Sequence, residues 1–389
     1  MSTLSDLINK HCPDGVEYKK ISDVCLVSRG RVISKETIRD DVGIYPVYSS
    51  QTENNGELGK ISTYDYDGEY LTWTTDGANA GTVFYRTGKF NVTNVCGLLK
   101  IVDANVHPKF LYHFLNMSAK SYVNKGMGNP KLMSNVMADI KIPVPPIEVQ
   151  CEIVRILDNF AELTAELTAE LTARKQQYEY YRNQLLTFAE TSMVEADRQT
   201  DRQTDRQTVI WKQLDNISLN YDRMRKPVTK NLRSAGQYPY YGASGIVDYV
   251  DQYLFDGDFL LISEDGANLV ARKTPIAFGI SGKNWVNNHA HILKFDDVLL
   301  QRYVEIYLNS IDLTPYISGG AQPKLNQDNL NKIPIPIPTY HQLKNIVSIL
   351  DRFDSICNDI SIGLPAEIEL RKKQYEYYRD KLLNFKEIA

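Results

Sequence analysis

A fifteen-residue segment occurs twice in this chain. Residues 174–188 (RKQQYEYYRNQLLTF) and 371–385 (RKKQYEYYRDKLLNF) begin 197 residues apart and are identical at 11 of 15 positions. A match of this length indicates a tandem duplication, so we expect two related halves. In both copies, aromatic and leucine residues recur every three or four positions, which places them on one stripe of an α-helix. Each half is therefore predicted to end in a long amphipathic helix.

The stripe is the candidate subunit-interface surface of these helices. It contains Tyr178, Tyr181 and Leu185, and in the second copy Tyr375, Tyr378 and Leu382. Tyrosines can stack on nucleic-acid bases, but the helical spacing favours a packed core or a contact with another subunit.

Length and composition favour a cytoplasmic protein of two or three domains. The chain has 389 residues, of which 43% are hydrophobic and 24% charged, and this is the composition of ordinary globular domains. We expect no membrane span because no apolar run approaches ~18 residues. The N-terminus lacks the pattern of a secretion signal. The five cysteines are scattered without a CxxC pair, which is typical of free thiols in a reducing compartment.

The net charge of −4 argues weakly against nucleic-acid binding, but the charges are segregated. Residues 146–172 hold six acids and one base, whereas residues 209–234 hold six bases and two acids. Local patches rather than the total decide whether a surface binds a polyanion. The second of these segments is therefore a candidate contact with a polyanion.

Residues 1–146 are predicted to form a first globule of mixed strands and helices. Short runs rich in tyrosine, threonine and aliphatic residues predict strands, and PKFLYHFLNM predicts a helix. The expected strands are residues 44–48, 70–74, 82–85 and 98–102, and the expected helix is residues 108–117. The proline-rich segment 140–146 is predicted to be an extended edge or exit segment.

Residues 147–190 are predicted to form one long helix. Residues 161–172 within it read AELTAELTAELT, three copies of a strongly helix-forming unit. Each such unit adds about 6 Å of length and about 40° beyond a full turn. The array is either a solvated spacer or an adjustable ruler. Residues 191–208, which contain DRQT three times, are predicted to be a flexible linker, with a short polar helix as the alternative.

The second half repeats this plan. Residues 209–338 form the second predicted globule and residues 339–389 the second long helix, kinked near 363–365 by Gly363 and Pro365. DGAN occurs at residues 76–79 and again at 265–268, and NPKL at 129–132 corresponds to QPKL at 322–325. The expected fold class is α+β: two similar mixed α/β domains separated by two long antiparallel helices, related by a pseudo-two-fold repeat.

The order of these segments resembles the DNA specificity subunit of type I restriction–modification enzymes. The resemblance rests on two globules, each followed by a proline exit and a long helix, IPVPPIEVQ with IVRILDNF and IPIPTYHQ with IVSILDRF. The AELT array resembles the spacer repeat of one subgroup of that family. The DRQT array departs from the family pattern.

The resemblance implies two target-recognition domains that read a bipartite, asymmetric site in double-stranded DNA. It implies two methyltransferase subunits docked on the helices, and restriction subunits that translocate DNA with ATP. S-adenosylmethionine, ATP and Mg²⁺ are then expected only on those partners, so this chain would be non-catalytic and free of cofactor. The alternative is a helical protein-interaction scaffold that does not read a DNA sequence.

Three pairs of segments supply the candidate DNA contacts. The loop pair gives Asn129, Lys131, Gln322 and Lys324, and the DGAN pair gives Asn79 and Asn268. The basic segments of the two globules give Arg29, Arg31 and Lys35, and Arg223, Arg225 and Lys226. Lysine and arginine neutralise phosphates, and arginine, asparagine and glutamine match base edges. Against this, NPKL and DGAN can be turns required by the fold, which we favour for DGAN, and the basic segments can be solvated loops.

Sequence motifs for nucleotide binding and for methyl transfer are absent. The sequence contains no GxGxxG, no GxxxxGK[ST] and no methyltransferase loop of the N-P-P-[FY] type. His289 and His291 form an HxH pair, but no carboxylate or cysteine stands at ligand spacing, so a structural role is favoured over a metal site. Asp14, Glu17 and Lys19 stand too close together for a nuclease trio.

Overall fold

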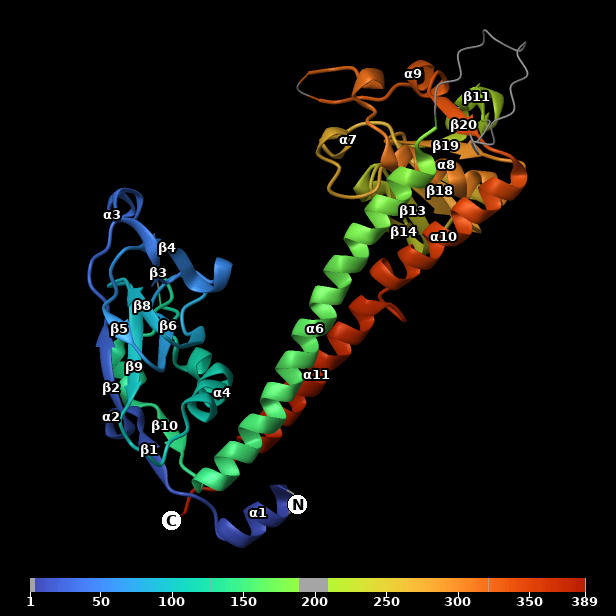
Figure 1. Ribbon diagram of the computed structural model, residues 1–389. Coiled ribbons are helices and arrows are strands. Elements are labelled where there is room, and N and C mark those ends of the chain that lie inside the picture. The colour runs from blue at the N-terminus through green and yellow to red at the C-terminus, as the bar shows by residue number, and fades with distance from the viewer. Residues whose placement is uncertain (1–3, 127, 189–208, 321, 389) are drawn as a thin grey trace, which may run out of the picture. The chain divides into compact units, whose positions relative to one another are not determined.

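The computed structural model describes residues 4–126, 128–188, 209–320 and 322–388 (Figure 1). The chain divides into two compact units, one of Met1–Ala169 with Ala366–Ala389 and one of Glu170–Pro365. Each unit contains one globule and a part of each long helical stretch. The predicted linker at residues 191–208 lies outside the described residues.

The first unit is built on two four-stranded sheets. Its strands are β1 (Tyr18–Lys20), β2 (Cys25–Arg29), β3 (Val42–Tyr48), β4 (Glu57–Ile61), β5 (Tyr66–Asp67), β6 (Tyr70–Thr74), β7 (Val83–Arg86), β8 (Lys89–Val92), β9 (Cys96–Ile101) and β10 (Lys141–Pro143). One sheet has the order β2-β9-β6-β7 and is antiparallel throughout. The other has the order β4-β3-β8-β5, with β3 and β8 parallel. Among the strands that the structure describes, the proline-containing β10 pairs only with β1, which confirms the expected edge position.

One helix covers the antiparallel sheet of the first unit. The short helices are α1 (Leu4–His11), α2 (Ile21–Val24), α3 (Lys35–Asp40), α4 (Pro108–Ser118) and α5 (Ser134–Asp139). Helix α4 begins with Pro108 because the first turn needs no N–H there. Its Phe110 and Leu111 share a buried core with Leu71 and Trp73 of β6. The predicted strands and helix of this globule are confirmed within a few residues.

The second unit repeats the arrangement. Its strands are β11 (Ile210–Gln213), β12 (Leu219–Asn220), β13 (Ala235–Gly242), β14 (Gly245–Val250), β15 (Phe255–Asp256), β16 (Phe259–Ser263), β17 (Ala277–Ile280), β18 (Lys283–Val286), β19 (Ala290–Lys294) and β20 (Pro334–Ile337). Its short helices are α7 (Asn268–Ala271), α8 (Val298–Ser310) and α9 (Gln327–Asn331). The sheet orders β12-β19-β16-β17 and β14-β13-β18-β15 match those of the first unit, and β13 and β18 are again parallel. The internal duplication is therefore present in the fold.

Three long helices complete the two units: α6 (Ile147–Leu186), α10 (Tyr340–Asn358) and α11 (Leu364–Leu382). In the first unit α6 and α11 run side by side in opposite directions, and Phe160 stacks on Tyr378 with 5.3 Å between ring centroids (Figure 1). In the second unit α6 packs against α10, where Tyr181 stacks on Phe353 at 5.6 Å. The predicted antiparallel helix pair is confirmed in each unit.

The second helical stretch is interrupted at residues 359–363, between α10 and α11. The Asp359 carboxylate accepts hydrogen bonds from the N–H groups of Ser361 and Ile362, which closes a turn there. Pro365 lies in the first turn of α11, where proline is tolerated, so the break precedes it. Among the described residues, no helix is both long enough and apolar enough to cross a membrane.

Candidate nucleic-acid interface

The DGAN and NPKL segments of the first unit meet in space. The N–H of Gly77 donates to the carbonyl of Pro130 at 3.0 Å, and the N–H of Leu132 donates to the carbonyl of Thr75 at 2.9 Å. The two segments, considered separately in the sequence, therefore form one surface.

The same pair of backbone hydrogen bonds, which we call the loop frame, occurs in the second unit. Gly266 donates to the carbonyl of Pro323 at 3.1 Å, and Leu325 donates to the carbonyl of Glu264 at 2.8 Å. Sequence reasoning missed this pairing because the segments lie more than fifty residues apart in each half. The recurrence of both motifs in each half was the available signal. Both units thus present one loop pair in one backbone arrangement.

The polar tips of these loops face solvent. Asn129, Lys131, Gln322 and Lys324 are all exposed. The Nζ of Lys324 lies 3.1 Å from a carboxylate oxygen of Glu264. In contrast, Lys131 makes no ion pair with any residue that the structure describes. All four side chains can therefore reach a ligand outside the protein.

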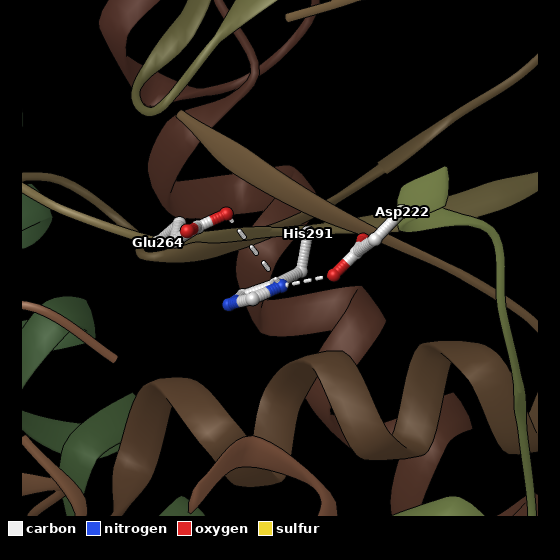
Figure 2. Close-up of side chains that lie close together, drawn as sticks. All are labelled: Asp222, Glu264 and His291. Atoms are coloured by element: carbon white, nitrogen blue, oxygen red, sulfur yellow. Dashed lines mark hydrogen bonds and ion pairs between the residues drawn. The ribbon is translucent and has the colours of Figure 1, made fainter. Parts of the chain in front are cut away.

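Three side chains from distant parts of the second globule come together in its interior (Figure 2). The Nδ1 atom of His291 lies 2.5 Å from a carboxylate oxygen of Asp222 and 3.9 Å from one of Glu264. Asp222 belongs to a 3₁₀ turn, Glu264 follows β16, and His291 is in β19. The sequence analysis found no carboxylate near the HxH pair at ligand spacing, because these carboxylates come from other elements.

Cations already balance this cluster. Arg225 Nη1 lies 2.7 Å from Glu264, and Arg225 Nη2 lies 3.4 Å from Asp222. Burial opposes ionisation of both carboxyls, but hydrogen bonds from His291 and from Arg225 outweigh it and lower the pKa of Asp222 and the pKa of Glu264. A divalent metal here would have to displace the guanidinium and lie beside Lys324. The donor set therefore fits an ion-pair network better than a metal ion.

The basic residues of the first unit differ in how firmly they are held. Arg29 Nε donates to the Ser134 hydroxyl at 3.1 Å, and Arg31 forms an ion pair with Asp65 at 2.8 Å. Lys35 is exposed in the first turn of α3 and forms no ion pair with a described residue. An exposed ion pair contributes only about 0–1 kcal/mol, so a phosphate can compete for Arg31. Arg29 is exposed and forms no ion pair with a described residue.

In the second unit the neighbouring basic residues have different surroundings. Arg223 and Lys226 are exposed. Arg225 lies between them in the chain, but its side chain is only 12% exposed and holds the carboxylate cluster. Our prediction that Arg225 contacts DNA is therefore not favoured by its position, since moving it outward would remove a cation from the buried Asp222 and the partly buried Glu264.

The two asparagines of the DGAN pair also differ. Asn79 is exposed and donates to the Thr52 hydroxyl at 2.9 Å. Asn268 donates to the carbonyl of Thr274 at 3.0 Å and accepts from the N–H of Thr274 at 3.1 Å. These two hydrogen bonds close residues 268–274 into a loop. Asn268 therefore has the structural role that the sequence analysis weighed for the DGAN turn.

The predicted helix stripe makes contacts within the chain. Its members Tyr375, Tyr378 and Leu382 pack in the first unit, and Tyr178, Tyr181 and Leu185 in the second. Two other tyrosines of the repeat, Tyr180 and Tyr377, are each 61% exposed and occupy equivalent positions in the two copies. Both fall outside the spacing of the predicted stripe.

Each globule is also fixed to a long helix by charged or polar contacts. In the first unit Asp158 of α6 accepts from Lys109 at 2.6 Å and from His113 at 3.0 Å, both on α4. In the second unit Arg302 of α8 donates to Asp351 of α10 at 2.8 Å. Asp158 and Asp351 are the aspartates of the two ILD segments, 193 residues apart. The sequence analysis used these two segments for the family resemblance but did not assign their aspartates to a junction with the globules.

Comparisons with known proteins agree with the duplicated fold. The family model described as the type I restriction modification DNA specificity domain matches the chain twice, at residues 13–174 and 206–370. A type I specificity subunit of Mycoplasma pneumoniae is 31% identical over 373 residues, which span 94% of this chain and 97% of that protein. The specificity subunit of the type I restriction enzyme MpnII, also from Mycoplasma pneumoniae, is 44% identical over 178 residues, 45% of this chain and 54% of that protein.

A solved structure supports the same fold. The crystal structure of the type I restriction–modification S subunit from M. genitalium matches with a TM-score of 0.63 at 15% identity, over 95% of this chain and 96% of that chain. At this identity the likeness concerns the fold alone. The two matches to the family model and the relative that spans almost the whole chain decide the family. The chain belongs to the family of type I restriction–modification DNA specificity subunits.

Proposed function

We propose that this chain is the DNA-reading subunit of a type I restriction–modification complex and that each unit reads one half of a split, asymmetric site. The observation that carries the proposal is the loop frame that both units share. In each unit the DGAN and NPKL or QPKL segments are joined by the same backbone hydrogen bonds and present exposed polar side chains. Two related readers suit two half-sites, and differences between their side chains suit different sequences.

The residues divide into two roles. Both loops have a lysine at the same position, Lys131 in the first and Lys324 in the second. We assign these lysines to the phosphate backbone, which is the same in every sequence. Asn129 and Gln322 differ between the loops and carry amides that can bond base edges, so we assign them to bases. Other exposed basic residues add further phosphate contacts in this proposal, namely Arg29, Arg31, Lys35, Arg223 and Lys226.

The catalytic steps belong to partners in this proposal. Two methyltransferase subunits would dock on the long helices and methylate adenine with S-adenosylmethionine, and restriction subunits would use ATP. The exposed Tyr180 and Tyr377 fit such docking because aromatic side chains dominate protein interfaces and these two are duplicated. The chain itself would position its partners without turnover.

The test is selection of bound sequences from a random DNA library by the full chain together with its methyltransferase partner. We expect two blocks of defined sequence separated by an unread gap. Lys131→Gln and Lys324→Gln should each weaken binding to all sequences and reduce the salt slope by about 1. A single continuous block, or no sequence preference, would contradict the proposal.

Partner docking needs its own test. Tyr180→Ala and Tyr377→Ala should each lower the number of bound methyltransferase subunits from two to one, while the double variant should bind none. Neither residue lies in a recognition loop, so the sequence preference should be unchanged. Binding of two subunits by the double variant would remove these tyrosines from the interface.

A further inference from the structure

Both recognition loops contain a leucine whose carbonyl oxygen accepts a hydrogen bond from a buried ring N–H. In the first unit the indole Nε1 of Trp73 donates to the carbonyl of Leu132 at 3.0 Å. In the second unit the imidazole Nε2 of His291 lies 2.8 Å from the carbonyl of Leu325. Leu132 and Leu325 are the last residues of NPKL and QPKL. The two loops are therefore anchored at the same atom by different side chains.

The two donors lie on the central strands of the antiparallel sheets, β6 and β9 in the first unit and β16 and β19 in the second. They occupy the same register position but come from opposite strands of that pair. Trp73 of β6 faces Gly97 of β9, whereas His291 of β19 faces Ile262 of β16. A Cβ atom on Gly97 would lie 2.2 Å from the Trp73 ring, so glycine leaves the space that the indole fills. The position of the anchor has thus been kept while its chemistry differs between the copies.

The hydrogen bonds of His291 assign its protons. A carbonyl oxygen only accepts, so Nε2 carries a hydrogen toward Leu325. A proton must also lie between Nδ1 and the Asp222 carboxylate, 2.5 Å away. The other oxygen of Asp222 accepts from the N–H of Ile292 at 2.9 Å. Asp222 therefore holds the ring in the orientation that aims Nε2 at the loop.

The charged neighbours of this anchor also reach the loop. Glu264 binds Arg225 through one carboxylate oxygen and Lys324 through the other, and its carbonyl accepts from the N–H of Leu325. Lys324 is itself a loop residue. In the first unit Thr75 supplies the equivalent carbonyl, but a threonine has no charge to offer Lys131. The second loop is thus held by charged groups where the first is held by an indole.

We infer that Trp73 and His291 are the positioning residues of the two recognition loops, and that Asp222, Glu264 and Arg225 form a charged support that acts on the second half-site alone. The inference rests on the proposed function for its link to DNA. Its structural part, the anchoring of each loop, does not. Each anchor acts through the loop backbone, so its loss should change one half-site and leave the other intact.

The anchoring is tested by hydrogen exchange on the full chain without DNA. His291→Leu should speed exchange at the Lys324 and Leu325 amides by about tenfold, the effect of losing one hydrogen bond, and should leave residues 129–132 unchanged. Trp73→Phe should speed exchange within residues 129–132 and leave the Lys324 and Leu325 amides unchanged. Glutamine places its amide nitrogen where Nε2 lies, so His291→Gln should restore protection better than His291→Asn, whose shorter side chain stops near the Nδ1 position.

The link to reading is tested by library selection with the same variants and the methyltransferase partner. His291→Leu should reduce discrimination at the second half-site about tenfold with the first half-site unchanged, and His291→Gln should recover part of it. Unchanged exchange in His291→Leu would overturn the anchoring. Faster exchange with unchanged discrimination would overturn the role in reading. If the unaltered chain shows no sequence preference, the proposed function fails, and the exchange data alone decide the anchoring.

Discussion

The Nε2 atom of His113 lies 3.0 Å from a carboxylate oxygen of Asp158. On the other side of the ring, Nδ1 lies 3.1 Å from the hydroxyl of Tyr375. Burial lowers the pKa of His113 and raises the pKa of Tyr375 to about 12, so the ring is neutral and the phenol protonated. Tyr375 therefore donates to His113, which donates to Asp158. This relay joins α4, α6 and α11 within the first unit.

Breaking the relay should destabilise the first unit. His113→Leu removes the partner of the Tyr375 hydroxyl and one of the two partners of the Asp158 carboxylate, which should cost about 1–3 kcal/mol of unfolding free energy. Urea unfolding followed by the fluorescence of Trp73 reports on this unit, in a chain with Trp211 and Trp285 replaced by phenylalanine. Glu152→Gln is the control because it removes only the pair with the exposed Arg155, and it should change stability by less than about 0.5 kcal/mol.

The same histidine predicts how stability depends on pH. Because folding lowers the pKa of His113, the unfolded chain binds more protons once the pH falls below about 6.5. The free energy of unfolding of the first unit should therefore decrease from pH 7 to pH 5. The His113→Gln variant should lose this part of the dependence. A wild-type midpoint that is constant over this range would contradict the neutral buried ring.

Arg302 carries the corresponding junction in the second unit. It binds Asp351, Asp354 and Glu305, and although burial opposes its charge, these carboxylates raise its pKa. Arg302→Leu would leave the three acids close together. Because the site is partly exposed, we expect a loss of roughly 2–3 kcal/mol, below the ~3–5 of a fully buried pair. Unfolding in guanidinium chloride measures this loss of free energy. Arg302→Lys should restore only part of the stability because lysine lacks the planar guanidinium that binds two carboxylates at once.

The exposed basic residues of the second unit should appear in the salt dependence of DNA binding. The double variant Arg223→Gln, Lys226→Gln should reduce the slope of log K against log salt by about 2. Arg225→Gln is the contrast, since it should lower the thermal stability of the second unit by removing the partner of Asp222 and Glu264. An unaltered slope in the double variant would remove both residues from the phosphate contacts.

The AELT array should determine the unread gap between the half-sites. Deleting residues 164–167 shortens the helix by about 6 Å and rotates it by about 40°, close to the ~35° turn of one base pair. We expect the gap in the selected or methylated sequence to change in length while both sequence blocks stay the same. A gap of unchanged length would show that the array is only a spacer.

Several features of the fold were predictable from local pattern. Apolar residues at helical spacing predicted α6, which was expected to end at residue 190 and ends at Leu186. Strand β6 matches its predicted bounds, since a run of threonine, tryptophan and leucine favours a buried strand. The end of α6 was less accurate because helix termini depend on a few weak contacts.

The anchors of the recognition loops were not predictable from such patterns. Asp222, Glu264 and His291 follow no regular spacing in the sequence. They meet because β16 and β19 pair in one register and because Asp222 lies in a 3₁₀ turn next to them. Trp73 likewise reaches Leu132 across 59 residues of sequence. Contacts of this kind depend on which strands become neighbours, and local pattern does not specify that.

The sequence by itself determined that the chain is a duplication whose halves each combine a mixed globule with a long amphipathic helix. Repeats and helical periods are local properties that need no knowledge of neighbours. The tertiary structure decided what each charged residue does. Arg223 and Arg225 stand two positions apart in one basic segment, yet the first faces solvent and the second lies among buried carboxylates. Burial and charge pairing are set by strands distant in sequence, so only the folded chain separates a residue that can contact DNA from one that supports it.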